Sequence, residues 1–108
     1  MRTTSQSITC AARLAVLADP TRLAVIEALL EGPRNVGEIN KGLRVPQNLL
    51  SHHLKILRDA GLVVSTREGK AVRYAIAPGV ELRRSHKAIN LGCCSLTFQN
   101  VQFGKKVQ

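Results

Sequence analysis

Residues 46–62 read PQNLLSHHLKILRDAGL, and this stretch decides the fold of the chain. It begins with Pro46, whose fixed φ and missing N–H suit the first position of a helix. Leu50, Leu54 and Leu57 then recur at intervals of four and three residues, which places them on one helix face. Gly61 supplies the left-handed residue that commonly ends a helix. The stretch therefore predicts an amphipathic helix with one broad apolar face.

The opposite face of this helix is polar. It carries Gln47, Asn48, Ser51, His52, Lys55 and Arg58. These side chains offer amide groups, a hydroxyl group and positive charges, which can bind base edges and phosphates in the major groove of DNA. A helix that packs on one side and presents such groups on the other is typical of a recognition helix.

Three shorter helices are expected before the recognition helix. Thr9 can cap the first, which runs to about Leu17. Asp19 and Pro20 form a sharp start for the second, because Asp is a good N-cap and Pro suits the first helical position. Asn35, with Glu38 three residues later, resembles a capping box and opens the third. The third helix, a turn and the recognition helix match the helix-turn-helix pattern.

The period of the apolar residues changes from helical to alternating after the recognition helix. Residues 63–76 alternate around Glu68 and Gly69, which predicts a β-hairpin. A last helix is expected after Gly79, and its apolar face would carry Leu82, His86, Ile89 and Cys93 if the helix continues through Gly92. The predicted fold is mainly α with a two-stranded β-wing, which is a winged helix-turn-helix.

The domain organisation is simple, because the sequence contains no internal repeat and no long linker. We expect residues 1–94 to form one winged helix-turn-helix domain for DNA binding and dimerisation. The apolar pattern fades from Ser95 onward, and the chain ends in FGKKVQ. Residues 95–108 are therefore expected to form a flexible, solvated tail.

The net charge of the chain is +9, with sixteen Lys and Arg against seven Asp and Glu. Such a charge favours a polyanionic partner, and nucleic acid is the first candidate. Only one Tyr and two Phe are present, which argues against single-stranded binding by base stacking. No apolar run approaches the ~20 residues of a membrane span, and residues 1–10 lack the apolar core of a signal peptide. We therefore expect a cytoplasmic protein with reduced thiols, double-stranded DNA as its partner and no membrane contact.

Three motifs resemble the ArsR/SmtB family of bacterial repressors. They are DPTRL at residues 19–23, SHHLKILRDAGLV at residues 51–63 and REGKAVRYAI at residues 67–76. The resemblance implies a homodimer built through the first and last helices. It also implies a repressor of metal- or metalloid-resistance operons that leaves DNA when an inducer binds.

The sequence departs from this family at two known metal sites. The family's cysteine pair in the third helix, within a motif like ELCVCDL, has no counterpart in NVGEINKGL at residues 35–43. The family's zinc site on the last helix uses Asp, His and Glu, and this chain offers only Glu81 and His86 there. His86 is therefore interpreted as an interface residue and not as a ligand. The remaining pair, Cys93 and Cys94, resembles arsenical-resistance members with a C-terminal cysteine pair.

The residues predicted to contact DNA lie on the recognition helix and the wing. They are Gln47, Asn48, Leu49, Ser51, His52, His53, Lys55, Arg67, Lys70 and Arg73. Residues in the first turns of the helix are expected to read base edges, since Gln and Asn suit adenine and Leu suits a thymine methyl group. Lys55 and the wing cations are expected to bind phosphates. His53 lies on a half-apolar stripe, where it either packs or binds a phosphate.

Cys93 and Cys94 are the predicted ligands of an inducer, with Cys10 as a third ligand. Two neighbouring thiols can both bind a soft ion as thiolates. Trivalent arsenic and antimony bind three sulfurs in a pyramid, whereas zinc prefers four ligands. Cys10 would reach the pair, within one subunit or between two, if the first and last helices pack antiparallel at the dimer interface. A monosubstituted arsenical would need only the pair, and the pair could also be two small residues in a partly buried tail.

These observations predict a homodimeric repressor that binds operator DNA and is released when As(III) or Sb(III) binds cysteine thiolates. No cofactor is expected to be required for DNA binding. In the alternative, the same repressor senses oxidants or reactive sulfur, and Cys10 would be a better disulfide partner than an adjacent cysteine. An enzyme is not expected, because the sequence has no CxxC motif and no glycine-rich phosphate loop. A constitutive architectural DNA binder is a further alternative.

Overall fold

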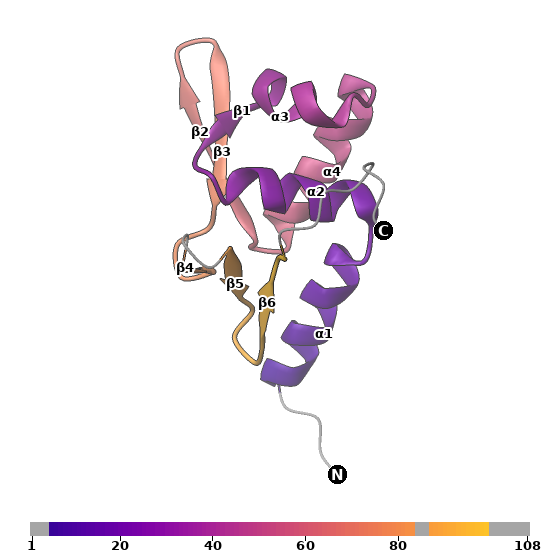
Figure 1. The fold of residues 1–108 in the computed structure, drawn as a ribbon, viewed down its shortest axis with the longest axis vertical. Coiled ribbons are helices and arrows are strands. Elements are labelled where there is room, and N and C mark those ends of the chain that lie inside the picture. Colours follow the sequence, from indigo (N-terminus) through magenta and orange to yellow (C-terminus); the bar gives the residue numbers. More distant parts are fainter. Residues whose placement is uncertain (1–4, 84–86, 100–108) are drawn as a thin grey trace.

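The computed structural model describes residues 5–83 and 87–99 (Figure 1). The helices of this part are α1 (Ser5–Leu17), α2 (Pro20–Leu29), α3 (Val36–Leu43) and α4 (Gln47–Asp59). The strands are β1 (Arg34–Asn35), β2 (Val63–Glu68), β3 (Ala71–Ile76), β4 (Glu81–Arg83), β5 (Ala88–Asn90) and β6 (Ser95–Thr97). Figure 1 shows the hairpin of β2 and β3 at one end of the molecule, with α1 and the sheet of β4, β5 and β6 towards the other.

Side chains cap the first turns of α2 and α3, as the sequence predicts. Asp19 accepts hydrogen bonds from the backbone N–H groups of Thr21 at 2.8 Å and Arg22 at 3.0 Å. Asn35 and Glu38 form a reciprocal capping box, with N···O distances of 2.8 and 2.9 Å. A cap of this kind is worth about 1 kcal/mol of stability. The first helix differs from its prediction, because α1 begins at residue 5 and not at residue 9.

The predicted amphipathic helix is confirmed as α4. Pro46 is its N-cap and not its first helical residue. Leu50, Leu54 and Leu57 are completely buried. Gly61, with a φ of 78°, lies just beyond the helix in the left-handed region that the sequence assigns to it.

The predicted hairpin is also confirmed, since β2 and β3 pair with Val63 opposite Ile76 and Glu68 opposite Ala71. The sequence did not predict β1, which joins the other side of β3 and gives the strand order β1-β3-β2. Two residues are too few to show an alternating pattern. Strand β1 thus joins the hairpin to the rest of the protein.

The predicted last helix is wrong. Residues from β4 to β6 form a second antiparallel sheet in the order β4-β5-β6. Gly92 has a φ of 99°, and its N–H donates to Oδ1 of Asn90 at 2.9 Å, which turns the chain between β5 and β6. Ile89 is buried in β5 and Cys93 lies in the turn, so their helical spacing is a coincidence. His86 lies outside the described residues.

Strand β6 lies in the segment that the sequence predicts to be a tail. Ser95 pairs with Asn90, and Thr97 pairs with Ala88. Leu96 and Phe98 pack against the apolar core. The ordered body of the protein therefore includes residues 95–98, while residues 100–108 lie outside the described part of the chain.

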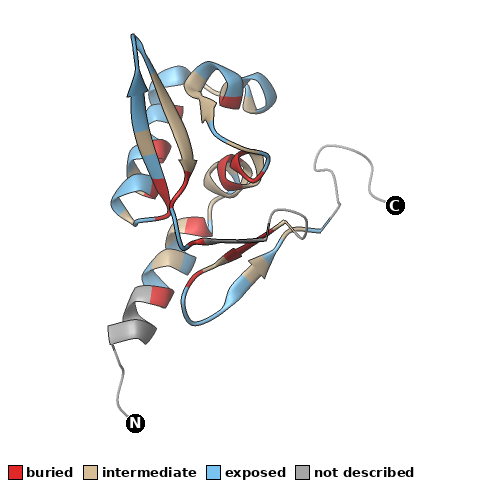
Figure 2. Ribbon diagram, turned by 90° about the vertical axis from the view of Figure 1, so that its left-hand side faces the viewer, coloured by how far each residue is buried: buried red, intermediate tan, exposed pale blue. Residues whose placement is uncertain are grey.

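One apolar core joins the helices to both sheets (Figure 2). Its largest fully buried members are Val25, Ile26, Leu29, Leu30, Ile39, Leu50, Leu54, Leu57, Leu62, Val63, Ile89 and Leu91. Burying a side chain of this size stabilises a fold by about 1.5–3 kcal/mol. The core therefore fixes α4 against α2, α3 and β2. None of the described helices is long and apolar enough to cross a membrane.

Candidate nucleic-acid interface and thiol cluster

The first turns of α4 present their polar residues to solvent. Exposed side chains here are Gln47, Asn48, Leu49, Ser51 and His52. Leu49 is 41% exposed although it is apolar, because it lies on the outer side of the helix. An exposed row of amides, a hydroxyl group and one apolar side chain can meet base edges in a major groove. Contact between these residues and DNA stays a prediction.

His53 lies on the inner side of α4 and is only 8% exposed. Its Nδ1 is 3.0 Å from Nη1 of Arg22 on α2. Because a guanidinium group can only donate, Nδ1 of His53 is the acceptor of this hydrogen bond. The structure thus places His53 against α2, in agreement with its position on the half-apolar stripe, and separates it from the exposed row of α4.

Lys55 is exposed on α4 and forms an ion pair with Asp59, with an N···O distance of 2.9 Å. The hydrogen bond from Lys55 lowers the pKa of Asp59 below its usual value. An exposed ion pair one helical turn apart contributes little to stability, because water and salt screen it. Lys55 can therefore exchange Asp59 for a phosphate at little cost.

The three wing cations differ in their surroundings. Arg67 and Lys70 are exposed near the tip of the hairpin. Arg73 donates to Oε1 of Glu68 at 3.1 Å and to the carbonyl oxygen of Pro33 at 3.1 Å. Arg67 and Lys70 are thus available to phosphates, while Arg73 also ties the hairpin to the segment before β1.

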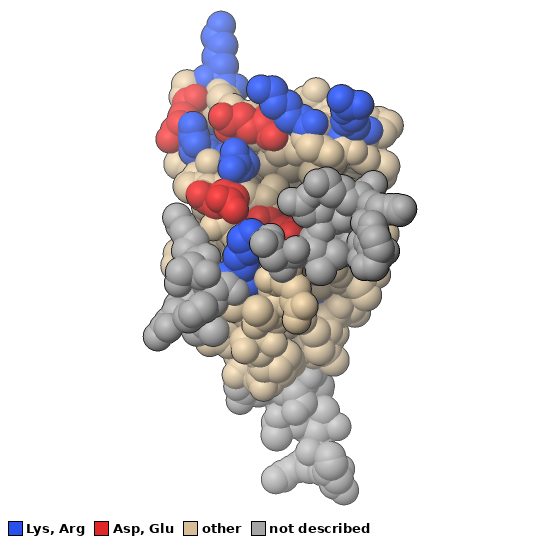
Figure 3. All heavy atoms as spheres, in the orientation of Figure 1, with Lys and Arg blue, Asp and Glu red and all other residues tan. Residues whose placement is uncertain are grey.

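Lys and Arg side chains gather at one end of the face shown in Figure 3. This is the end that carries the hairpin and the short helix α3 in Figure 1, and acidic side chains lie among the cations. The surface towards α1 is mostly uncharged where it is described. The visible cations therefore lie at the end of the molecule where the wing is expected to meet phosphates.

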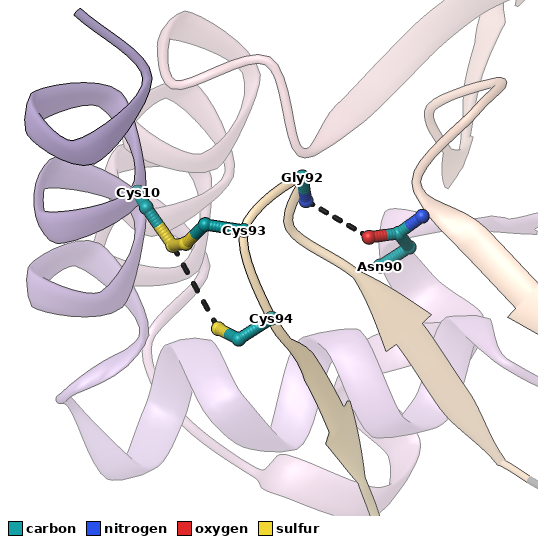
Figure 4. The surroundings of a disulfide bond; sticks show 5 residues. All are labelled: Cys10, Asn90, Gly92, Cys93 and Cys94. Atoms are coloured by element: carbon teal, nitrogen blue, oxygen red, sulfur yellow. Dashed lines mark hydrogen bonds between the residues drawn. A yellow bond between two sulfur atoms is a disulfide. The ribbon is translucent and has the colours of Figure 1, made fainter. Parts of the chain in front are cut away.

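Three sulfur atoms from distant parts of the chain meet at the opposite end (Figure 4). Cys10 is buried on α1 and is joined to Cys93 by a disulfide, with a Cα–Cα distance of 6.2 Å. Sγ of Cys94 lies 3.7 Å from Sγ of Cys10. All three sulfurs lie within 4.8 Å of one another, so the structure brings the three predicted ligands together within one chain. We call Cys10, Cys93 and Cys94 the thiol cluster.

The turn between β5 and β6 explains how two adjacent cysteines reach the same partner. Neighbouring side chains on a regular strand point to opposite faces. Here the Asn90–Gly92 hydrogen bond and a second bond, from the N–H of Leu91 to the carbonyl oxygen of Cys94 at 2.8 Å, close a tight turn. Both thiols then point towards α1 (Figure 4). The sequence predicted this meeting from a helix that does not exist, and the turn achieves it instead.

The donor set of the thiol cluster limits what it can bind. Among the described side chains, Cys10, Cys93 and Cys94 form the one group of three or more His, Cys, Asp or Glu residues whose ligand atoms lie close enough together to hold an ion. A structural zinc site normally needs four ligands. Soft, thiophilic ions accept a set made only of sulfur. The cluster therefore suits a three-coordinate soft ion in its reduced form and a disulfide in its oxidised form.

Two arginine contacts of α1 were missed in the sequence. Nε of Arg13 donates to the carbonyl oxygen of Ala60 at 3.3 Å. Nε of Arg22 donates to the carbonyl oxygen of Val16 at 2.6 Å. In each contact an arginine side chain donates to the backbone carbonyl group of a residue elsewhere in the chain. No periodic pattern in the sequence could have revealed such contacts.

Comparison with known proteins agrees with this geometry. Residues 19–65 match a family described as "Bacterial regulatory protein, arsR family". The chain is 45% identical over 76 residues to the HTH-type transcriptional regulator CmtR of Mycobacterium tuberculosis, and the match covers 70% of this chain and 59% of CmtR. It is 38% identical over 87 residues to a probable mercury resistance operon repressor of Streptomyces lividans, covering 73% and 70% of the two chains.

Solved structures also share the fold, HlyU and Mb0332 among them. HlyU from Vibrio cholerae has a TM-score of 0.66 at 33% identity, covering 68% of this chain and 79% of HlyU. Mb0332 from Mycobacterium bovis, described as a homodimeric winged helix-turn-helix DNA-binding domain, has a TM-score of 0.61 at 31% identity, covering 65% of each chain. CmtR is described as a transcriptional regulator and Mb0332 as a winged helix-turn-helix DNA-binding domain, which confirms the predicted fold and the prediction of a family of DNA-binding regulators rather than enzymes. The chain belongs to the arsR family of bacterial regulatory proteins.

Proposed function

We propose that this protein is a cytoplasmic, metalloid-responsive transcriptional repressor. It binds operator DNA as a homodimer and leaves the DNA when As(III) or Sb(III) binds the thiolates of Cys10, Cys93 and Cys94. The observation that carries this proposal is the meeting of three sulfurs within 4.8 Å in one chain whose other end carries an exposed helix-turn-helix. The matched part of the chain spans only 59% of the length of CmtR. The proposal is therefore argued from the residues of this chain and not from the function of CmtR.

The DNA-binding half of the proposal rests on charge and exposure. In a dimer, two copies of α4 would enter successive major grooves, roughly 34–36 Å apart. Gln47, Asn48, Leu49, Ser51 and His52 would then read bases. Lys55, Arg67, Lys70 and Arg73 would bind phosphates and fix the register.

Helix α1 supports dimerisation because it exposes an apolar surface. Leu14 is 40% exposed, and Ala11, Ala12 and Ala15 are exposed beside it. Small residues allow the backbones of two helices to approach closely. We therefore propose α1 as the dimer contact of this chain, in agreement with its relative Mb0332, which is described as homodimeric.

The metalloid half of the proposal rests on the chemistry of the three thiols. A cellular dithiol first reduces the Cys10–Cys93 disulfide and supplies two electrons and two protons. Arsenous acid then exchanges its three hydroxyl groups for the sulfurs of three thiols, whose protons leave with the hydroxyl groups as three waters. The product is a neutral three-sulfur pyramid that joins α1 to the turn between β5 and β6. By linkage, the ligand releases DNA only if this closed state binds DNA more weakly than the open state.

A second candidate function is favoured by the disulfide itself. Cys10 and Cys93 have a Cα–Cα distance of 6.2 Å, which is normal for a disulfide. Hydrogen peroxide could form this bond by accepting two electrons and two protons and leaving two waters. In this alternative, the same repressor senses oxidants or reactive sulfur. The relative described as a mercury resistance operon repressor adds Hg(II) as a third soft inducer to test.

Operator binding measured by fluorescence anisotropy tests these proposals. The probe is the DNA upstream of the protein's own gene, with unlabelled random DNA as competitor and the reduced dimer as protein. Arsenite, antimonite, Hg(II) and peroxide are compared on the wild type and on Cys10→Ser, Cys93→Ser and Cys94→Ser. We expect arsenite to weaken binding at least tenfold in the wild type, a change of about 1.4 kcal/mol, and Cys94→Ser to remove most of the effect.

Each other outcome selects an alternative. Release by peroxide and not by arsenite would support the oxidant sensor. Release by Hg(II) alone would change the inducer. Equal affinity for random DNA would indicate an architectural protein, and arsenite release that survives all three substitutions would refute the thiol cluster as the sensor.

A further inference from the structure

We propose that Arg13 is the positioning residue that transmits the state of the thiol cluster to the recognition helix. This inference rests on the proposed function, in which the cluster controls DNA binding, and adds a physical connection between the two sites. Arg13 lies on α1 with Cys10, and its Nε donates to the carbonyl oxygen of Ala60 at the end of α4, at 3.3 Å. A single side chain thus joins α1, the helix that carries Cys10 of the thiol cluster (the sensor), to α4, the recognition helix (the reader).

The sensor end of this connection is a continuous helix. Cys10 and Arg13 are three residues apart, so they lie on neighbouring positions of one side of α1. With a rise of 1.5 Å per residue, about 4.5 Å separates them along the helix axis. Because α1 runs unbroken from Ser5 to Leu17, a displacement of Cys10 also displaces Arg13.

The reader end of the connection is the last turn of α4. Ala60 is the C-cap of this helix, and its carbonyl oxygen lies at the negative end of the helix dipole, where a cation is favoured. Gly61 follows with a φ of 78°, and a Cβ atom there would lie 3.2 Å from Nη2 of Arg13. The guanidinium group therefore lies directly against the backbone that ends the recognition helix.

Arg22 makes a second connection, which holds the C-terminal end of α1 in place. Arg22 donates to the carbonyl oxygen of Val16 near the end of α1, at 2.6 Å, and to Nδ1 of His53 in the middle of α4, at 3.0 Å. Asp19 holds the backbone of Arg22 through the cap of α2. The C-terminal end of α1 is thus held against α2 and α4, while the part that carries Cys10 is joined to the turn between β5 and β6 by the Cys10–Cys93 disulfide and is released from it on reduction. Arg13 lies between these two points.

The expected consequence is a change at the C-terminal end of α4 when the cluster closes. Opening the cluster frees Cys10 from Cys93, lets α1 turn about the Arg22 contact and moves Arg13 relative to Ala60, and closure by arsenic or by oxidation reverses this movement. The stability of the last turn of α4 then depends on the state of the sulfurs. Since the DNA-reading residues are on the same rigid helix, the change alters how α4 meets DNA.

Amide hydrogen exchange of α4 tests this inference. The full chain is compared with the cluster open, in the presence of a thiol reductant, and closed in two independent ways. Arsenite closes it through arsenic–sulfur bonds, and diamide closes it by taking two electrons and two protons from a pair of thiols. We expect closure by either agent to change the exchange rates of residues 58–62 roughly threefold or more in the wild type.

Three variants separate the role of Arg13 from general effects. Arg13→Gln, which removes the charge, should lose the response of residues 58–62 to closure. Arg13→Lys keeps the charge but not the planar group and should show a reduced response. Arg58→Gln removes an exposed arginine from the same turn of α4 and should keep the full response. If Arg13→Gln does not fold, a full response in Arg13→Lys would still refute the proposal.

The remaining outcomes are equally decisive. A response in Arg13→Gln as large as in the wild type, or no response of the wild type to either agent, would overturn the inference. A response to diamide with none to arsenite would support the Arg13 connection and reject the metalloid as inducer. The failure of the proposed function and the failure of this inference are therefore distinguishable.

Discussion

The reader of this molecule, formed by α2, α3 and α4, and its sensor, formed by α1 and the sheet of β4, β5 and β6, share one apolar core, but the sensor also has contacts between sulfur atoms. The helices α2, α3 and α4 share a set of completely buried Leu, Ile and Val side chains, and α2 and α3 start with capped turns. The sheet of β4, β5 and β6 consists of strands of three residues and meets α1 through sulfur atoms. Apolar packing does not respond to redox state or to soft ions, whereas thiols respond to both. The comparison explains how one end can change chemically while the other keeps its shape.

The largest effect is expected from the sulfur bond in the sensor. The Cys10–Cys93 bond joins residues that are 83 positions apart. Closing a loop of this length restricts the unfolded chain by about 4–5 kcal/mol in the chain-entropy account. We expect urea unfolding to show that the oxidised protein is more stable than the reduced protein by up to this amount. Cys94→Ser keeps both partners and serves as the control, and an unchanged midpoint after reduction would contradict the prediction.

The next largest effect is expected in the core of the reader. Leu54 is completely buried on α4, so Leu54→Ala should lower the free energy of unfolding by about 2–5 kcal/mol. Val64→Ala, at a position that is 38% exposed, is the control and should stay within about 0.5 kcal/mol. Both are measured by urea unfolding under reducing conditions. Similar losses for the two variants would show that the reader is not held by its core.

A smaller effect is expected on DNA affinity, and it should differ between α4 and the wing. Asn48→Ala should cost about 1–3 kcal/mol at the operator and relax the base preference at one position. Lys70→Ala should weaken binding to all sequences and lower the slope of affinity against salt by about one. Anisotropy titrations at several salt concentrations check both. Sequence-selective loss in Lys70→Ala would reverse the two roles.

The smallest effect is expected at the cap of α2. The hydrogen bond from the backbone of Arg22 lowers the pKa of Asp19, so the ionised cap stabilises the folded state. This contribution is present above the unfolded pKa of about 4 and is lost as the pH falls through the lower folded pKa. Asp19→Ala should cost about 1 kcal/mol at pH 7 and less under acid conditions. Thermal unfolding of the two proteins from pH 7 to pH 3 measures this, and a difference that grows on acidification would contradict it.

The helices of the reader and the hairpin beside them could be predicted from sequence because patterns over a few neighbouring residues indicate them. The leucine spacing of α4, the Asn35–Glu38 capping box and the alternation of residues 63–76 are local patterns. The sensor could not be predicted in this way, because strands of three residues form only with their partners. Ile89 and Cys93 have a helical spacing, and only Gly92 indicated a turn between them.

The thiol cluster could be predicted in composition but not in geometry. The chain contains three cysteines and was expected to be cytoplasmic, so its reduced thiols were predicted to bind a soft ion. Their meeting depends on a turn between β5 and β6 and on the packing of α1, which are tertiary features. The burial of His53 against Arg22 and the Arg13–Ala60 contact belong to the same class.

The most direct test of the account is the stoichiometry of DNA release. Reduced protein is saturated with labelled operator DNA and titrated with arsenite at a protein concentration far above the dissociation constants, while anisotropy is recorded. If the three thiols of one chain form one switch, release should rise linearly and end at one arsenite per chain. Release that ends at one arsenite per two chains, or that continues unchanged in Cys10→Ser, would contradict the single-chain switch.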